Sequence, residues 1–202
     1  FSFYDLHSLE TNTILNLKMQ KAKIDVWGVG TNLITAYDQP ALGAVYKIVS
    51  IENDQGVMQD TIKLSNNAEK VSTPGKKQVW RITSRAKGKS EGDYITFADT
   101  DVNALDEINM FHPTYTYINK TVRDFDAVPL LVPIYDKGQL IYDLPSLDEI
   151  KAYATKELDE LWNEYKRVLN PQDYPVDLAK DVWDNKMTLI DNVRKKAHDL
   201  SE

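Results

Sequence analysis

The sequence contains no cysteine, and this absence excludes several kinds of chemistry at once. Thiol nucleophiles, iron–sulfur clusters, cysteine zinc sites and disulfides are all ruled out. Three widely separated histidines do not suggest a zinc centre either, so we expect no protein-bound metal in this chain. The lack of cysteine fits a reducing compartment, and we expect the protein to work in the cytoplasm.

Long apolar runs and an excess of positive charge are missing as well. No stretch approaches the roughly 20 apolar residues needed to span a bilayer. The 24 Lys and Arg residues are outnumbered by 31 Asp and Glu residues, which gives a net charge of −7. Without a global positive field the chain is not expected to bind nucleic acid or a membrane surface, and any anion site must be local.

The 202 residues suffice for one large or two small domains, and 42% hydrophobic with 27% charged residues is typical of a globular protein. The opening Phe1-Ser-Phe-Tyr-Asp5 has no initiator Met, basic n-region or apolar h-region, so we expect a piece of something longer. Residues 8–19 have a helical apolar stripe with Ser8 as candidate N-cap, and residues 23–27 form a compact strand candidate before a glycine turn. This order is typical of one α/β repeat, which we assign to residues 1–50.

Residues 51–202 predict strands first and helices afterwards. β-Branched and aromatic runs predict strands at residues 44–51, 57–64, 78–83, 93–97, 114–118, 128–135 and 139–142, so the first predicted strand begins shortly before residue 51. Turn residues at 53–56, 87–89 and 136–138 predict hairpins. The last sixty residues predict two helices, one from the capping box at Ser146 to about Leu169 and one from about Leu178 to His198. The fold class is therefore α/β plus α+β.

The segment Gly28-Val29-Gly30-Thr31 is the clearest candidate for chemistry. Its glycines let backbone N–H groups approach an anion, and the Thr hydroxyl adds a donor. The segment is neither a dinucleotide fingerprint nor a P-loop, because no third glycine follows at the right spacing and no Lys-Ser/Thr pair closes it. Plain turn chemistry is the alternative.

Basic residues provide the other candidates. Lys47 lies inside an apolar run, where an outward-facing strand lysine is the alternative to a binding role. The densest basic patch surrounds Thr73-Pro74-Gly75, and either a solvated hairpin tip or a polyphosphate contact fits it; its members are Lys70, Lys76, Lys77 and Arg81.

Three further groups have simpler structural interpretations. His112 has no nearby Ser or acid and is expected to be a packed or hydrogen-bonded residue. The acidic series of residues 148–164 is expected to be a solvated helix face. The four tryptophans at positions 27, 80, 162 and 183 are expected to anchor the core.

Several motifs together carry a resemblance to a known family. The runs at residues 23–31 and 36–47 closely resemble the carboxyl-terminal half of bacterial nicotinate phosphoribosyltransferase. The resemblance continues through Glu69-Lys70, Thr73-Pro74-Gly75, Glu91-Gly92-Asp93, Met110-Phe111-His112-Pro113, Leu169-Asn170-Pro171 and residues 181–187. It spans nearly the whole chain.

The resemblance implies transfer of ribose 5-phosphate from phosphoribosyl pyrophosphate to nicotinate, with ATP and Mg²⁺, in NAD biosynthesis by salvage. It implies that residues 1–50 are the end of the truncated α/β barrel of a type II phosphoribosyltransferase, followed by a β-hairpin and helical carboxyl-terminal domain over residues 51–202. In this family a glycine loop takes the 5′-phosphate, so the implied contacts are Gly28, Val29, Gly30 and Thr31, with Lys47 and Lys70 as helpers.

The family's phosphorylatable histidine and its Arg-Leu-Asp-Ser-Gly-Asp-type segment lie amino-terminal to the region matched. None of His7, His112 and His198 sits in the family's Gly-Thr-x-x-His setting. We therefore assign no catalytic residue here, and expect a fragment that is inactive alone and that forms a homodimer or associates with an amino-terminal half. A non-catalytic interaction or regulatory module derived from the same fold is the alternative.

Overall fold

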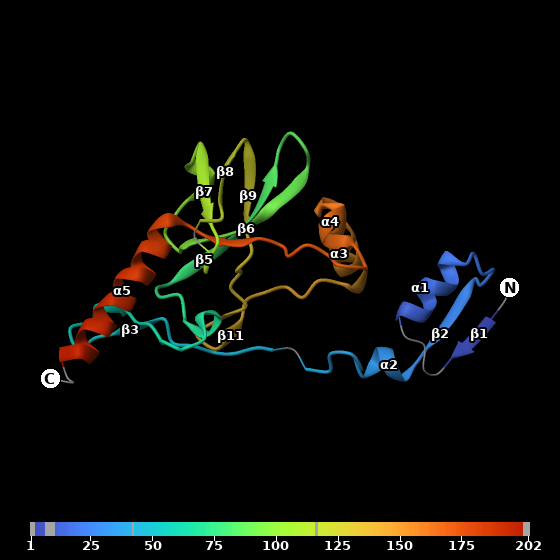
Figure 1. Ribbon diagram of the computed structural model, residues 1–202, viewed down its shortest axis with the longest axis horizontal. Helices are drawn as coiled ribbons and strands as arrows, with labels where there is room; N and C mark the ends of the chain where they lie inside the picture. Colours follow the sequence, from blue (N-terminus) through green and yellow to red (C-terminus); the bar gives the residue numbers. More distant parts are fainter. Residues whose placement is uncertain (1–2, 7–10, 42, 116, 200–202) are drawn as a thin grey trace. The chain divides into compact units, whose positions relative to one another are not determined.

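A computed structural model describes residues 3–6, 11–41, 43–115 and 117–199 of the chain. The chain forms two compact units, residues 1–46 and residues 47–202 (Figure 1). The functional assignment of the two parts of the chain remains a prediction.

The first unit is a small parallel β-α-β arrangement. Strand β1 (Phe3–Leu6) pairs in parallel with β2 (Val26–Val29), and helix α1 (Thr11–Met19) connects them. A short helix α2 (Thr31–Ile34) follows β2. A crossover helix between parallel strands is the connection that such strands require, so the predicted α/β repeat is confirmed. His7 and the predicted N-cap Ser8 lie outside the described residues.

The predicted strand at residues 23–27 is placed too early. Pairing with β1 begins at Val26 and continues to Val29, which lies opposite Leu6. Gly28 and Val29 are therefore strand residues and not part of a turn. The change of direction begins only at Gly30.

The second unit is built on a six-stranded mixed sheet with the strand order β8-β7-β12-β6-β5-β9. Its strands are β5 (Lys77–Ser84), β6 (Lys89–Phe97), β7 (Glu107–Phe111), β8 (Asn119–Arg123), β9 (Phe125–Pro129) and β12 (Val176–Leu178). Two small hairpins accompany it, β3 (Ser50–Glu52) with β4 (Met58–Asp60) and β10 (Tyr135–Asp136) with β11 (Gln139–Leu140). The three predicted hairpin turns are confirmed.

Three predicted strands are wrong. Residues 128–135 include only the last two residues of β9 and the first residue of β10, with irregular backbone at 130–134 between them. Of residues 44–51 only the last two belong to β3, because residues 43–49 have no strand partner. Residues 114–118 contain a turn, because the His112 ring nitrogen Nδ1 accepts hydrogen bonds from the backbone N–H groups of Thr114 and Tyr115 at 3.1 and 2.9 Å. This contact confirms the structural interpretation of His112.

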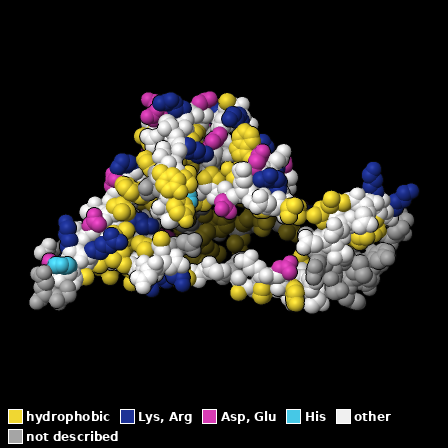
Figure 2. Space-filling model, in the orientation of Figure 1, with side chains coloured by type: hydrophobic (Ala, Val, Ile, Leu, Met, Phe, Trp, Pro, Cys, Tyr) yellow, Lys and Arg dark blue, Asp and Glu magenta, His cyan; other side chains and the backbone are white. Residues whose placement is uncertain are grey.

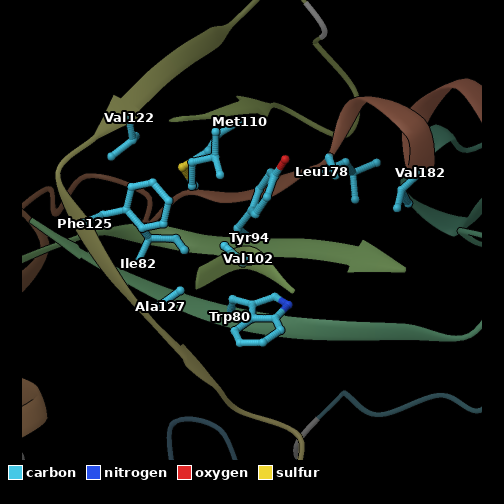
Figure 3. Close-up of a cluster of buried hydrophobic side chains, with 12 residues drawn as sticks. Trp80, Ile82, Tyr94, Val102, Met110, Val122, Phe125, Ala127, Leu178 and Val182 are labelled. Carbon is cyan, nitrogen blue, oxygen red and sulfur yellow. The ribbon is translucent and has the colours of Figure 1, made fainter. Parts of the chain in front are cut away.

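The core lies on one face of the sheet (Figure 3). Along β5 side chains alternate, so Trp80 and Ile82 point into the core while Arg81 points to the opposite face. The core is completed by Tyr94, Val102, Ile108, Met110, Val122, Phe125, Ala127, Leu178, Ala179 and Val182. Trp80 is thus a core anchor, and Trp183 packs against the same cluster.

The helices of the second unit are α3 (Leu147–Glu160), α4 (Asn163–Lys166) and α5 (Lys180–Asp199), with short 3-10 turns η1 (Ala68–Lys70) and η2 (Val102–Ala104). The capping box at Ser146 is confirmed. No helix in the described ranges is long and apolar enough to cross a membrane.

Both carboxyl-terminal helix predictions need correction at one end. Helix α3 stops at Glu160, because Leu161 and Trp162 become extended and the Trp162 indole N–H donates to the Ser90 carbonyl at 3.0 Å. Leu178 is not helical, because it belongs to β12 and lies opposite Ile95 and Phe111 in the sheet.

Candidate functional site

The glycine segment lies where β2 ends and α2 begins. Gly28 and Val29 are the last two residues of β2, Gly30 precedes the helix, and Thr31 is its first residue. The Gly30 carbonyl accepts hydrogen bonds from the N–H groups of Leu33 and Ile34 at 3.1 and 3.2 Å, so the chain turns immediately after the strand. Thr31 is exposed, and the three residues before it are half-buried.

This position agrees with the general place of phosphate sites in α/β proteins, which is the carboxyl end of a parallel strand. A phosphate here would meet backbone between β2 and α2, and the exposed Thr31 would offer its hydroxyl. The binding role of these four residues remains a prediction.

Lys47 and Lys70 belong to the second unit, residues 47–202. Lys47 is exposed in the irregular segment 43–49, so the apolar strand expected around it is absent from the described structure. Lys70 is exposed at the end of η1. The structure therefore describes the glycine segment and these two lysines in separate units.

The basic patch around Thr73-Pro74-Gly75 is not a uniform solvated tip. Lys77 is half-buried, and its Nζ donates to the carbonyl oxygens of Thr73 and Gly75 at 2.7 and 2.5 Å. Burial lowers the pKa of Lys77, and the nearby Asp60 carboxylate opposes that shift. Pro74 and Gly75 are buried, so this lysine closes a packed turn.

Arg81, the last member of that patch, enters an ionic cluster that sequence reasoning missed. It lies directly opposite Asp93 in the sheet, and its Nε donates to Asp93 Oδ1 at 2.8 Å. Its Nη1 donates to Glu157 of α3. The Tyr174 hydroxyl donates to Asp93 Oδ1 at 2.9 Å and lies 2.6 Å from Ser90 Oγ.

The pKa shifts in this cluster favour fixed charge states. The Asp93 hydrogen bond raises the pKa of Arg81, and burial raises the pKa of Tyr174. Both shifts keep Arg81 charged and Tyr174 neutral near pH 7, which suits a structural ion-pair network better than proton transfer. The expectation that the acidic series is one solvated face is wrong for Glu157, whose side chain is 20% exposed.

A cavity of about 290 Å³ adjoins this cluster and is lined on its apolar side by Leu158, Leu161 and Tyr165. Both carboxylates beside it already pair with Arg81. The arrangement therefore attaches the end of α3 to the β5–β6 hairpin.

Two glycines of the family-like motifs serve close packing. Gly92 has φ +130°, and a Cβ there would lie 2.9 Å from the Pro175 carbonyl oxygen, whose partner is the Asp93 N–H at 2.9 Å. Gly75 has φ +86°, and a Cβ would lie 2.6 Å from the Phe97 ring. These motifs therefore fix turns against the sheet.

No group of three or more His, Cys, Asp or Glu residues that could hold a metal ion occurs in the part of the chain that the structure describes. The described residues thus do not define a Mg²⁺ site.

A parallel β-α-β unit together with a mixed sheet flanked by helices makes this an α/β protein. Residues 76–186 match the family described as the nicotinate phosphoribosyltransferase C-terminal domain. The chain belongs to that family, and the resemblance noted in the sequence is confirmed.

Several relatives extend the similarity over nearly the whole chain. Nicotinate phosphoribosyltransferase of Bacillus subtilis (strain 168) is 53% identical over 194 residues, which cover 96% of this chain and 39% of the relative. The Dictyostelium discoideum enzyme of the same name is 31% identical over 206 residues, covering 96% of this chain and 33% of the relative. The chain therefore spans about two fifths or less of these relatives' length.

A solved structure shows the same fold. The crystal structure of human nicotinic acid phosphoribosyltransferase aligns with a TM-score of 0.67 and 23% identity, covering 91% of this chain and 32% of the human chain.

Proposed function

We propose that this chain is the carboxyl-terminal portion of a nicotinate phosphoribosyltransferase that works in cytoplasmic NAD salvage. The whole protein joins nicotinate to phosphoribosyl pyrophosphate, forming nicotinate mononucleotide and pyrophosphate, with accompanying ATP hydrolysis. The observation that carries the proposal is the 53% identity to the Bacillus subtilis enzyme over 96% of this chain.

In this reaction the nicotinate ring nitrogen forms a bond to the ribose C1′ as the C1′–O bond to pyrophosphate breaks. Positive charge develops on the ribose ring, and negative charge grows on the departing pyrophosphate. Catalysis therefore depends mainly on positioning the two substrates, and binding of the 5′-phosphate holds the ribose in place.

We assign the 5′-phosphate to Gly28, Val29, Gly30 and Thr31, in what we interpret as the end of a truncated α/β barrel of the type II class. Support comes from the position of the segment at the carboxyl end of β2, immediately before α2. Lys47 and Lys70 are proposed as additional cationic contacts, since both are exposed lysines. Mg²⁺ and ATP are proposed for the whole protein, without ligands assigned in this chain.

The reaction is tested with full-length protein that contains these residues. Supplied with nicotinate, phosphoribosyl pyrophosphate, ATP and Mg²⁺, it should form nicotinate mononucleotide, while the 202-residue chain alone should form none. No product from the full-length protein would overturn the proposal and favour the non-catalytic module. Turnover by the isolated chain would overturn the expected inactivity of the fragment.

The phosphate assignment is tested by Gly30→Val in the full-length protein. The new side chain would stand where we expect the phosphate to approach, so affinity for nicotinate mononucleotide should fall at least about tenfold, equivalent to ~1.4 kcal/mol. Gly43→Val is the matched control, because a Cβ there has no atom within 4 Å. Equal affinity in the two variants would rule out this placement.

A further inference from the structure

The segment between β9 and α3, and the first half of α3 itself, expose several large apolar side chains. Leu144 and Leu147 are 78% and 71% exposed, and Leu131, Val132, Ile141 and Ile150 are each about half exposed. We call these six residues the apolar arm. Figure 2 shows hydrophobic side chains lying exposed among the charged ones on the molecular surface.

Helical geometry explains why this half of α3 stays uncovered. Leu147, Ile150, Glu157 and Leu161 recur on one face of the helix. Only the end of this stripe reaches the sheet, through the Arg81–Glu157 pair and the half-buried Leu161. None of the fourteen residues of α3 is buried, so the stripe begins well before the attachment point.

The first turn of α3 is nevertheless well defined. Ser146 accepts a hydrogen bond from the Glu149 N–H, and the Glu149 carboxylate accepts one from the Ser146 N–H at 2.7 Å. With a cap at one end and the Arg81 pair at the other, the helix presents its apolar side in a fixed direction. A preorganised apolar face loses less conformational entropy when it is covered.

We propose that the apolar arm docks against the part of the nicotinate phosphoribosyltransferase polypeptide that lies outside the matched region. The chain accounts for 39% of the Bacillus subtilis relative and 32% of the human chain, so about three fifths or more of each polypeptide lies outside the match. A partner in the same polypeptide has a high effective concentration, and exposed apolar side chains are more stable when such a partner covers them. The proposal rests on family membership and not on the proposed activity.

The test is thiol labelling at two positions of α3, which is direct because the chain has no cysteine of its own. Ile150→Cys places the thiol in the apolar arm. Ala152→Cys is the matched control, since Ala152 is exposed and lies about 200° around the helix from Ile150. Each variant is made in the 202-residue chain and in the Bacillus subtilis relative whose matched segment is replaced by this chain.

Maleimide labelling is followed by peptide-resolved mass spectrometry. In the isolated chain both thiols should react at similar rates. In the full-length protein Ile150→Cys should react at least tenfold more slowly, and Ala152→Cys should be unchanged. Leu147→Cys repeats the measurement should Ile150→Cys disturb folding.

Equal labelling of Ile150→Cys in the two proteins would overturn the proposal. Protection that disappears on dilution of the full-length protein would assign the surface to a second copy and also overturn it. Labelling does not depend on turnover, so its outcome is independent of the activity assay.

Discussion

Helix α5 buries Val182 and Lys186 against the sheet, whereas helix α3 buries none of its side chains. Both have an apolar stripe at helical spacing, and they lie apart on the two sides of the sheet in Figure 1. Helix α5 is held mainly by burial in the core, with Val182 fully buried. Helix α3 is held by a cap, by ion pairs and by contacts with the β5–β6 hairpin. The same sequence pattern thus does not decide how a helix is stabilised.

The largest expected effect comes from breaking the ionic attachment of α3. Arg81→Leu leaves the Asp93 side chain, which is 13% exposed, without its cation. The free energy of unfolding should fall by about 2–3 kcal/mol, and hydrogen exchange in α3 should accelerate. The control is Arg85→Leu, because Arg85 pairs with Asp126 at the exposed surface, where loss of an ion pair changes stability little. Equal unfolding midpoints in urea for the two variants would contradict this assignment.

Helix α5 should respond instead to loss of volume. Val182→Ala removes two methyl groups from a fully buried site and should lower the free energy of unfolding by about 2 kcal/mol. Leu147→Ala on α3 removes more carbon atoms from a site that is 71% exposed, and should change stability by less than about 0.5 kcal/mol. Thermal denaturation of both variants measures the difference. A larger loss at Leu147 would show that the apolar arm is already covered in the isolated chain.

Replacing Lys186 should have a smaller effect on the free energy of unfolding, and this effect should be stabilising. Burial lowers the pKa of Lys186, so its charged form carries a cost in the folded state below that lowered pKa. The cost disappears as the pH rises towards the ordinary value of 10.5. Lys186→Met should therefore stabilise the protein by about 1 kcal/mol at pH 7, and the gain should shrink in alkaline solution. The matched control is Lys195→Met, which should not stabilise the protein because Lys195 is exposed.

The smallest effect concerns the cap of α3. Ser146→Ala should destabilise the first turn by about 0.5 kcal/mol, visible as faster amide exchange there. Hydrogen bonds from Ser146 lower the pKa of Glu149, so the cap's contribution is present above pH 4.5 and is lost as the pH falls through the folded pKa. The variant Thr155→Ala, on the same helix, should lack this acid dependence. If the stability of both variants changed equally with falling pH, Glu149 would not be the cause of the acid dependence.

Local signals made much of the fold predictable. The turn at 87–89, the turn at 136–138 and the capping box at Ser146 all lie where the sequence indicates, because each depends on residues within a few positions. Strand β7 was missed although Ile108 and Met110 alternate with polar residues in the way that a half-buried strand requires.

Contacts between distant residues were not predictable. The end of α3 depends on Trp162 reaching Ser90, and the Arg81 cluster joins residues from β5, β6, α3 and the segment before β12. No spacing pattern in the sequence predicts contacts between residues so far apart in the chain. The glycine segment was found by its local composition, and its role at the 5′-phosphate stays a prediction that Gly30→Val tests.

Strand β12 has a consequence for how the chain acquires its structure. It lies between β6 and β7 and joins the β9-β5-β6 half of the sheet to the β7-β8 half. Val176 pairs with Asp93, so the joining contact spans more than eighty residues. During synthesis the two hairpin halves are made early, but they stay unjoined, with open edges, until residues 176–178 leave the ribosome. Assembly of the sheet is therefore a late event of high contact order, and the nascent chain is most prone to aggregation just before residues 176–178 emerge.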